Sequence, residues 1–264
     1  MRTVVPAVLL LAVLPACRVV DAPESLEDLA VFAFTTLPDR DPDVPTAAVD
    51  GLIVEIDTHR DALVEGYRIT DLTESDLVEA GVDATVATSI VGLAATASYS
   101  SAPHDLARAW TNPHMDEVLD STVAYVLLSE EGDRTCFVSG QCDTYAVEAE
   151  RSNAMGLFGT SSQTFVREFR WVRSDTLDAP LLAMRDLAPE PADISSGLAA
   201  VDQQYSYSLF VPDGSGALRF DAFWLEARVI GVDVPDTFAL DLSVTQMTRT
   251  AEQIDAWVAA NPER

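Results

Sequence analysis

Residues 165–172 read FVREFRWV and residues 220–224 read FDAFW, two short runs that are rich in aromatic and β-branched side chains. This composition is typical of β-strands. Phe223 and Trp224 are neighbours, and because successive side chains of a strand point to opposite faces, the second run places aromatic rings on both faces of its sheet. Such a strand is either buried on both sides or lines a pocket with one of them. Core packing is the ordinary explanation of this pattern, and a ligand site is the alternative.

Further strands are predicted around these runs from period-two alternation and β-branched composition. A helix that starts at Pro103 follows the first strand, and Ala251, Ile254 and Trp257 recur at helical spacing after the last one. Strands at hairpin spacing between helices predict an α+β fold, in which an antiparallel β-sheet domain is closed by a C-terminal helix. The strands are predicted at residues 89–99, 122–128, 144–149, 165–172, 205–211, 218–230 and 238–244.

The region before the sheet is predicted to be a helical segment. Ser25 and Thr73 each stand three residues before an acid and just ahead of apolar residues, which is the pattern of a capped helix start. Helices are predicted at residues 25–36, 46–65 and 73–80, with a strand at 52–57 as the alternative within the second. The helical segment therefore covers residues 25–84, and the antiparallel α+β domain covers residues 85–264.

Residues 97–110, ASYSSAPHDLARAW, form the predicted step from the first strand to its helix, and residues 238–260 form the end of the chain. This order of a strand, a helix, antiparallel strands and a closing helix resembles the helix-grip architecture of START and polyketide-cyclase-like lipid-binding domains. The resemblance extends from residue 89 onward and concerns topology. It implies a cavity between the curved sheet and the last helix that takes an apolar ligand. The predicted ligand contacts are Phe169, Trp171, Phe223 and Trp224.

Two arginines, Arg167 and Arg170, lie inside the first aromatic strand. A buried arginine needs an acidic partner, because an unpaired charge is costly to remove from water. Glu168 or Glu226 is the expected partner.

The N-terminus has the order of a secretory signal peptide: a charged start at Arg2, an apolar run and a small residue before a cysteine. Leu14-Pro15-Ala16-Cys17 resembles the lipobox of bacterial lipoproteins, which implies removal of residues 1–16 and attachment of lipid to Cys17. Ordinary signal-peptidase cleavage is the alternative, although Leu14 does not fit its small-residue rule. Residues 17–24 are then a lipid-anchored linker. By the same resemblance, Arg18-Val19 lacks the aspartate of inner-membrane retention, which favours the outer membrane.

Cys136 and Cys142 are the cysteines that remain after Cys17, and they flank a short loop with turn residues at its centre. Thiols of an exported protein meet an oxidising compartment, so the sequence predicts a disulfide between them. A pair of buried free thiols is the alternative.

The charge of the chain excludes one class of function. The formal net charge is -27, with 43 acids against 16 basic residues, and every basic residue is arginine. Nucleic-acid binding needs clustered cations, and the sequence has no such cluster. The excess of acids predicts a well-hydrated surface.

Residues that suggest catalysis or metal binding do not match known motifs. His104 and His114 are separated by Pro113 and fit no common zinc spacing. The acids between Asp39 and Asp50 imitate a calcium loop, but Val44 stands where its sharp turn needs glycine. No nucleophile elbow, P-loop or zinc-protease motif occurs in the sequence. We therefore expect neither a metal nor a cofactor.

Three hypotheses for function remain. The leading one is a cell-envelope lipoprotein with a noncatalytic binding or structural role, which contacts the membrane through its lipid and holds an apolar small molecule in the β domain. The second is an envelope hydrolase that uses acidic residues. The third is an adhesion or assembly module with an exposed aromatic patch.

Lipidation makes the membrane attachment depend on one sulfur atom. Cys17→Ser is expected to abolish incorporation of labelled fatty acid and to release the protein from membranes, because the hydroxyl does not accept the lipid. Labelling in growing cells and fractionation measure both effects. Unchanged labelling in the variant contradicts the lipobox interpretation.

Overall fold

The computed structural model describes residues 20–82, 90–156, 159–229 and 236–262, and for residues 229 and 236–243 it describes the backbone only. The signal peptide and Cys17 lie outside these residues. No helix in the described ranges is both long and apolar enough to cross a membrane.

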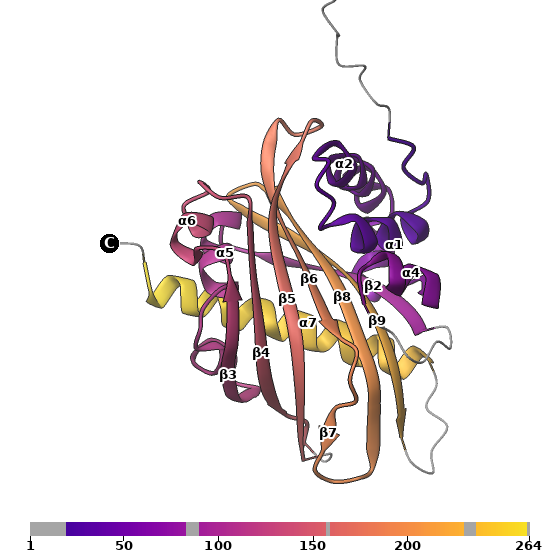
Figure 1. Ribbon diagram of the computed structural model, residues 1–264, viewed down its shortest axis with the longest axis vertical. Helices are drawn as coiled ribbons and strands as arrows, with labels where there is room; N and C mark the ends of the chain where they lie inside the picture. The colour runs from indigo at the N-terminus through magenta and orange to yellow at the C-terminus, as the bar shows by residue number, and fades with distance from the viewer. Residues whose placement is uncertain (1–19, 83–89, 157–158, 230–235, 263–264) are drawn as a thin grey trace, which may run out of the picture.

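Figure 1 shows the helices and strands of the described residues. The helices are α1 (Leu26–Thr36), α2 (Asp43–Thr58), α3 (Arg60–Glu65), α4 (Glu74–Glu79), α5 (Pro103–Trp110), α6 (Arg134–Val138) and α7 (Asp236–Ala260), with a 3-10 turn, η1, at Met115–Glu117. The strands are β1 (Tyr67–Leu72), β2 (Ile90–Tyr99), β3 (Thr122–Glu131), β4 (Thr144–Ala154), β5 (Thr160–Ser174), β6 (Ala179–Ala188), β7 (Asp193–Ile194), β8 (Ala199–Asp213) and β9 (Gly216–Val229).

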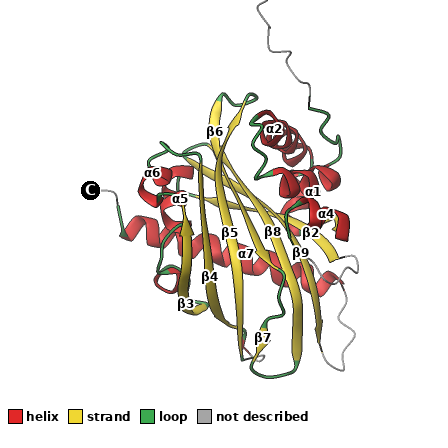
Figure 2. Ribbon diagram, in the orientation of Figure 1, coloured by secondary structure: helices red, strands yellow, loops and turns green. Residues whose placement is uncertain are grey.

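The strands form one antiparallel sheet in the order β1-β2-β9-β8-β6-β5-β4-β3, and β7 pairs with β5 beside this path. Helix α7 crosses one face of the sheet, which we call the α7 face, and α1 and α2 pack on the opposite face, which we call the α1 face (Figure 2). The α+β class, the N-terminal helices and the closing helix are therefore confirmed. The closing helix on a curved antiparallel sheet is the helix-grip arrangement that the sequence suggested.

An aromatic cluster joins the N-terminal helices to the α1 face. Phe34 of α1 is fully buried and packs against Trp224 with 5.1 Å between ring centroids. The Trp224 indole Nε1 donates a hydrogen bond of 2.9 Å to the carbonyl of Thr70. This cluster belongs to the hydrophobic core that α1, α2 and the sheet share.

Two arginines of the sheet bind the C-terminal end of α1. The Arg185 guanidinium donates to the Phe34 carbonyl at 3.0 Å and pairs with Glu168. Arg170 donates to the carbonyls of Leu37 and Asp39, both at 2.6 Å. The last carbonyls of a helix have no partner within the helix and carry partial negative charge, so a cation is favourable there.

The predicted N-terminal helices form, with two differences. The cap at Ser25 is present, and Thr73 and Asp76 form the expected capping box. The helix predicted at residues 46–65 is interrupted at His59, which separates α2 from α3, and no strand forms at residues 52–57. The segment also contains β1, which pairs with β2 at the edge of the sheet.

Two predictions within the sheet domain are wrong. Residues 238–244 were expected as a strand and are helical, since they belong to α7. Their apolar residues alternate, but a window this short also fits the spacing of a helix, and the helix continues through Ala251 and Ile254, which dock on the sheet. Strand β6 was not expected, because its sequence APLLAMRDLA holds no β-branched residue. It forms because β5 and β8 pair with it on both sides.

The aromatic contact of α1 gives a stability prediction. Phe34→Ala should lower the free energy of unfolding by about 3–5 kcal/mol, because it removes a large buried ring and leaves a cavity against Trp224. Phe32→Ala is the matched control in the same helix, since Phe32 is only half-buried. Urea denaturation of both variants measures the difference. Equal losses for the two variants contradict the role of Phe34 as the main contact between α1 and the sheet.

Candidate functional site

The α7 face can be followed row by row across the sheet, because residues directly opposite each other in an antiparallel pair point to the same side. The central row runs from β2 to β4 through Leu93, Phe223, Ser206, Asp186, Arg167 and Val147. The rows on one side of it are filled and the row on the other side is partly open, so the two sides are described in turn.

The filled side holds a cluster of aromatic rings under α5 and α6. Phe137 of α6 stacks with Trp171 and Tyr145 at centroid distances of 5.7 and 6.0 Å, and Phe169 lies 5.9 Å from Phe137. The Trp171 indole donates to the Phe137 carbonyl at 2.9 Å. These rings are buried and belong to a core that also includes residues of α7.

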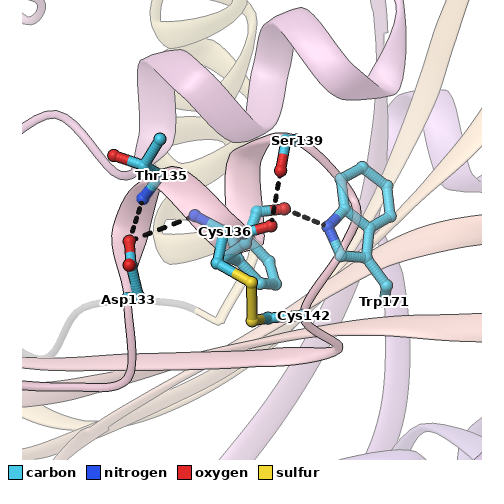
Figure 3. The surroundings of a disulfide bond; sticks show 7 residues. Asp133, Thr135, Cys136, Ser139, Cys142 and Trp171 are labelled. Atoms are coloured by element: carbon cyan, nitrogen blue, oxygen red, sulfur yellow. Dashed lines mark hydrogen bonds between the residues drawn. A yellow bond between two sulfur atoms is a disulfide. The ribbon is translucent and has the colours of Figure 1, made fainter.

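A disulfide between Cys136 and Cys142 closes the α6 loop over this cluster, as the sequence predicted (Figure 3). Asp133 caps the start of α6 by accepting hydrogen bonds from the backbone amides of Thr135 and Cys136. The disulfide therefore holds in place the helix turn that carries Phe137.

Two ion pairs lie at the centre of the face. The Arg167 guanidinium donates two hydrogen bonds of 2.6 Å to the Asp186 carboxylate, and Arg219 donates one of 2.7 Å to Asp221. All four residues are buried. The Trp110 ring lies 5.1 Å from the Arg167 guanidinium and 4.5 Å from that of Arg219, so one indole contacts both cations.

The electrostatics of Asp186 follow from these contacts. Burial by itself raises the pKa of a carboxyl, but the charge and hydrogen bonds of Arg167 outweigh it and hold the pKa of Asp186 below its ordinary value. A carboxylate in this state is a poor general acid at neutral pH. Within the described residues, Asp186 and Asp221 are the buried acids, and each is paired with an arginine.

The partly open row lies next to the ion pairs. On β2, β9 and β8 it contains Val91, Leu225 and Gln204, which are opposite one another and half-buried. On β6, β5 and β4 it continues with Ala188, Phe165 and Ala149, which form a small apolar cluster. Phe223 of the central row is half-buried as well. This row is apolar for most of its length.

Charged and phenolic groups lie in the adjacent row, beside the β4 end of the open row. Tyr125 of β3 and Arg151 of β4 are directly opposite each other, and both are half-buried. The Arg151 guanidinium lies 5.1 Å from the centre of the Phe165 ring, and the rings of Tyr125 and Phe165 are 6.3 Å apart.

The structure separates the residues that were predicted to contact a ligand. Phe169 and Trp171 lie together in the filled aromatic cluster, and Phe223 lies in the central row of the same face. Trp224 points to the α1 face, where it is fully buried against Phe34. The four side chains cannot line one pocket, because neighbours on a strand point to opposite faces.

The predicted partners of the strand arginines are also corrected. Arg167 pairs with Asp186, while Glu168 pairs with Arg185 on the other face. Arg170 binds backbone carbonyls and not a glutamate. Sequence reasoning considered acids near in sequence or within another aromatic strand, and it missed Asp186 because β6 was not recognised.

The candidate metal ligands have other roles. His104 is exposed, with its ring 4.6 Å from that of Trp171, and His114 is exposed. Asp50 accepts hydrogen bonds from Ser174 and Thr176 in the β5–β6 turn, and Asp39 accepts one from the backbone of Asp41. The described ranges hold no group of three or more histidine, cysteine or acidic side chains that is arranged to bind a metal ion.

Two surface grooves lie away from the open row. One, of about 340 Å³, runs between α2 and the β8–β9 hairpin, and the other, of about 710 Å³, lies where α5 meets the C-terminal end of α7. Arg60 and Asp213 face each other at the first, and Arg108 and Trp257 at the second.

Comparison with known proteins finds no related sequence and several solved structures of low similarity. No protein-family model matches the chain, and no curated protein sequence matches it. Several solved structures are similar to it in three dimensions. A START superfamily protein from Mycobacterium smegmatis has 9% identity and a TM-score of 0.44, over 65% of this chain and 99% of that one.

Two further structures have similar values. A STAR-related lipid transfer protein fragment from Xanthomonas axonopodis has 14% identity and a TM-score of 0.42, over 64% of this chain and 86% of that one. The human StarD13 lipid transfer and protein localization domain has 16% identity and a TM-score of 0.39, over 75% of this chain and 95% of that one. These values do not bear on the ligand or the activity of this protein.

The central ion pair gives a prediction about stability and pH. Asp186→Asn should lower the free energy of unfolding by about 3–5 kcal/mol at neutral pH, because it leaves the buried Arg167 charge without its partner. Asp186 has a lowered pKa in the folded protein, so its contribution is complete above the unfolded pKa of about 3.9 and is lost as the pH falls through the lower folded value. The difference between parent and variant should be constant from about pH 7 to 5 and shrink below about pH 4.

Asp175→Asn is the control for this measurement, because the Asp175 side chain is 79% exposed and its contact with Arg173 is long, at 3.9 Å. Its unfolding curve should stay close to that of the parent. A difference between Asp186→Asn and the parent that persists unchanged well below pH 4 contradicts the assignment of a charged Asp186.

Proposed function

We propose that the protein is a cell-envelope lipoprotein, anchored by lipid on Cys17, whose helix-grip domain binds an apolar small molecule without catalysing a reaction. The ligand lies on the open row of the α7 face. The observation that carries the proposal is the β2 and β9 end of this row, where the apolar side chains of Val91 and Leu225 stay half-buried beside two buried ion pairs.

The contrast between the two sides of the α7 face supports a binding role. Aromatic rings fill the side under α5 and α6, where Phe169 is 1% and Trp171 is 7% exposed. On the other side Val91, Phe223 and Leu225 remain half-buried although they point to the same face. Apolar side chains on a concave face that keep contact with solvent gain free energy when an apolar molecule covers them.

The state of the buried acids supports the noncatalytic part of the proposal. Asp186 and Asp221 are each paired with an arginine, and a carboxylate held in an ion pair has little tendency to donate or accept a proton at neutral pH. Hydrolysis by paired acids needs one carboxyl with a raised pKa beside an ionised one. Asp186 has the opposite shift, because Arg167 lowers its pKa, whereas burial raises the pKa of Asp221. The noncatalytic proposal therefore rests on the arginine that binds each carboxylate.

The envelope location rests on the sequence and the disulfide. The lipobox Leu14-Pro15-Ala16-Cys17 supplies the anchor, and the disulfide between Cys136 and Cys142 suits an oxidising compartment. Residues 17–24 are a short linker, so the domain lies close to the membrane surface from which an apolar ligand would come. Arg18-Val19 favours the outer membrane.

Binding of an apolar probe tests the proposal. The mature chain, residues 17–264, in its Cys17→Ser form should bind Nile red saturably, with one site and an increase in fluorescence. Phe223→Asp should weaken this binding by at least about 10-fold, because the ligand would bury an unpaired carboxylate. Leu128→Asp is the matched control, since Leu128 is 51% exposed on β3, and it should bind as the parent does. Absence of saturable binding to the parent, or equal loss in both variants, contradicts the proposal.

A further inference from the structure

Among the described strand side chains at the centre of the α7 face, positive charges outnumber negative charges by one, and Asp255 of α7 binds the backbone amides of Ser100 and Ser101 beyond β2. The cations are Arg151, Arg167 and Arg219, and the anions are Asp186 and Asp221. Asp186 is occupied by Arg167 through two hydrogen bonds, and Asp221 is occupied by Arg219 and by the Ser208 hydroxyl. Arg151 is therefore the cation without a matching anion.

The surroundings of Arg151 make this mismatch costly. Burial, followed by repulsion from Arg167, lowers the pKa of the Arg151 guanidinium, and Asp186 only partly offsets both. Arg151 and Arg167 each lie 5.1 Å from the centre of the same Phe165 ring, so two like charges share one aromatic side chain. Glu130 of the neighbouring strand β3 is exposed and accepts a hydrogen bond from Tyr145.

Two donors at this end of the row have no acceptor among the described residues. In the described part of the chain, no side chain or carbonyl accepts a hydrogen bond from the Arg151 guanidinium or from the Tyr125 hydroxyl. The two residues are directly opposite each other on β4 and β3. Burial raises the pKa of Tyr125, so its hydroxyl keeps its proton and remains a donor.

We propose that Arg151 and Tyr125 form an anion-binding subsite at the end of the open row, and that it holds the carboxylate of a long-chain monocarboxylate. The assignment deepens the proposed function and rests on it. A guanidinium binds a carboxylate through two parallel hydrogen bonds, and the Tyr125 hydroxyl adds a third donor. One unmatched positive charge fits a single negative charge, which favours a carboxylate over a phosphate dianion.

The open row extends away from this subsite as a path for the alkyl chain. It passes Phe165, Ala149 and Ala188, which are 4%, 0% and 4% exposed, so the chain has to displace the side chains that cover them before it reaches the half-buried Leu225 on β9. The four strand steps from β4 to β9 span roughly 19 Å at the usual strand spacing, which is the scale of a long alkyl chain. The side chains along it are apolar or uncharged, so the charge of the ligand is recognised at the Arg151 end only.

Matched ligands test the subsite. Oleate and oleyl alcohol have the same tail, and each is used to displace Nile red from the mature chain in its Cys17→Ser form. The parent should bind oleate about 10-fold or more tightly than the alcohol, which is the usual contribution of a charged hydrogen-bonded pair. Arg151→Gln should lower the affinity for oleate to that for oleyl alcohol and leave the affinity for the alcohol unchanged. Arg151→Lys should restore part of the preference for oleate.

Arg173→Gln is the charge-matched control, because the Arg173 side chain is 72% exposed at the end of β5 and its loss should not change the preference. Tyr125→Phe should weaken the binding of oleate and leave the binding of oleyl alcohol unchanged. This variant tests the subsite if Arg151→Gln does not fold. An unchanged ratio of oleate to alcohol in Arg151→Gln, or parent-like oleate binding in Tyr125→Phe, overturns the subsite while the apolar site stands. Tighter binding of oleyl phosphate than of oleate overturns the monocarboxylate assignment. Binding of neither oleyl compound overturns the proposed function itself.

Discussion

Arg167 and Asp186 face each other across β5 and β6 and are joined by two hydrogen bonds of 2.6 Å in the interior of the protein. A charge is stable there only when a partner and hydrogen bonds replace the water it has lost. A slip of one residue between these strands would turn one member of the pair to the other face and leave two unpaired buried charges. Arg219 and Asp221 restrict β9 in the same way, with Ser208 linking them to β8. The ion pairs therefore determine which side chains of the central strands face α7.

Once that register is set, the opposite side chains of the same strands must be covered by the N-terminal helices. Trp224 is fully buried, and Phe34 of α1 lies against its ring. Arg185, which pairs with Glu168, also donates to a carbonyl at the end of α1. Arg170 donates to carbonyls at the same place, so these carbonyls take the part of a second acid. A single sheet with both faces buried thus explains why the helices before it and the helix after it belong to one structure.

The division of the α7 face into a filled and an open side is what links the fold to a function. The disulfide between Cys136 and Cys142 and the rings under α6 close one side, so that no ligand is needed to shield it. The other side keeps half-buried apolar side chains on β2 and β9, and a buried cluster around Phe165 lies between them and Arg151. The chain has a net charge of -27, yet Arg151 is withdrawn from the acidic surface and has no paired anion among the described residues, and the anionic ligand proposed above would supply one.

The local sequence pattern was sufficient to predict those structural elements that depend on residues close together in the chain. The caps at Ser25 and Thr73, the disulfide and most strands followed from spacing and residue type, and these fixed the α+β class. Strand β6 and helix α7 were decided by tertiary contacts, since the sequence of β6 has helical propensity and the start of α7 alternates like a strand. The site was beyond the sequence for a related reason. Tyr125, Arg151 and Asp186 come from different strands, and only the pairing of those strands brings their side chains to one face. Alternation along a strand predicts that a residue faces one side of the sheet, but the register between strands decides which residues meet there.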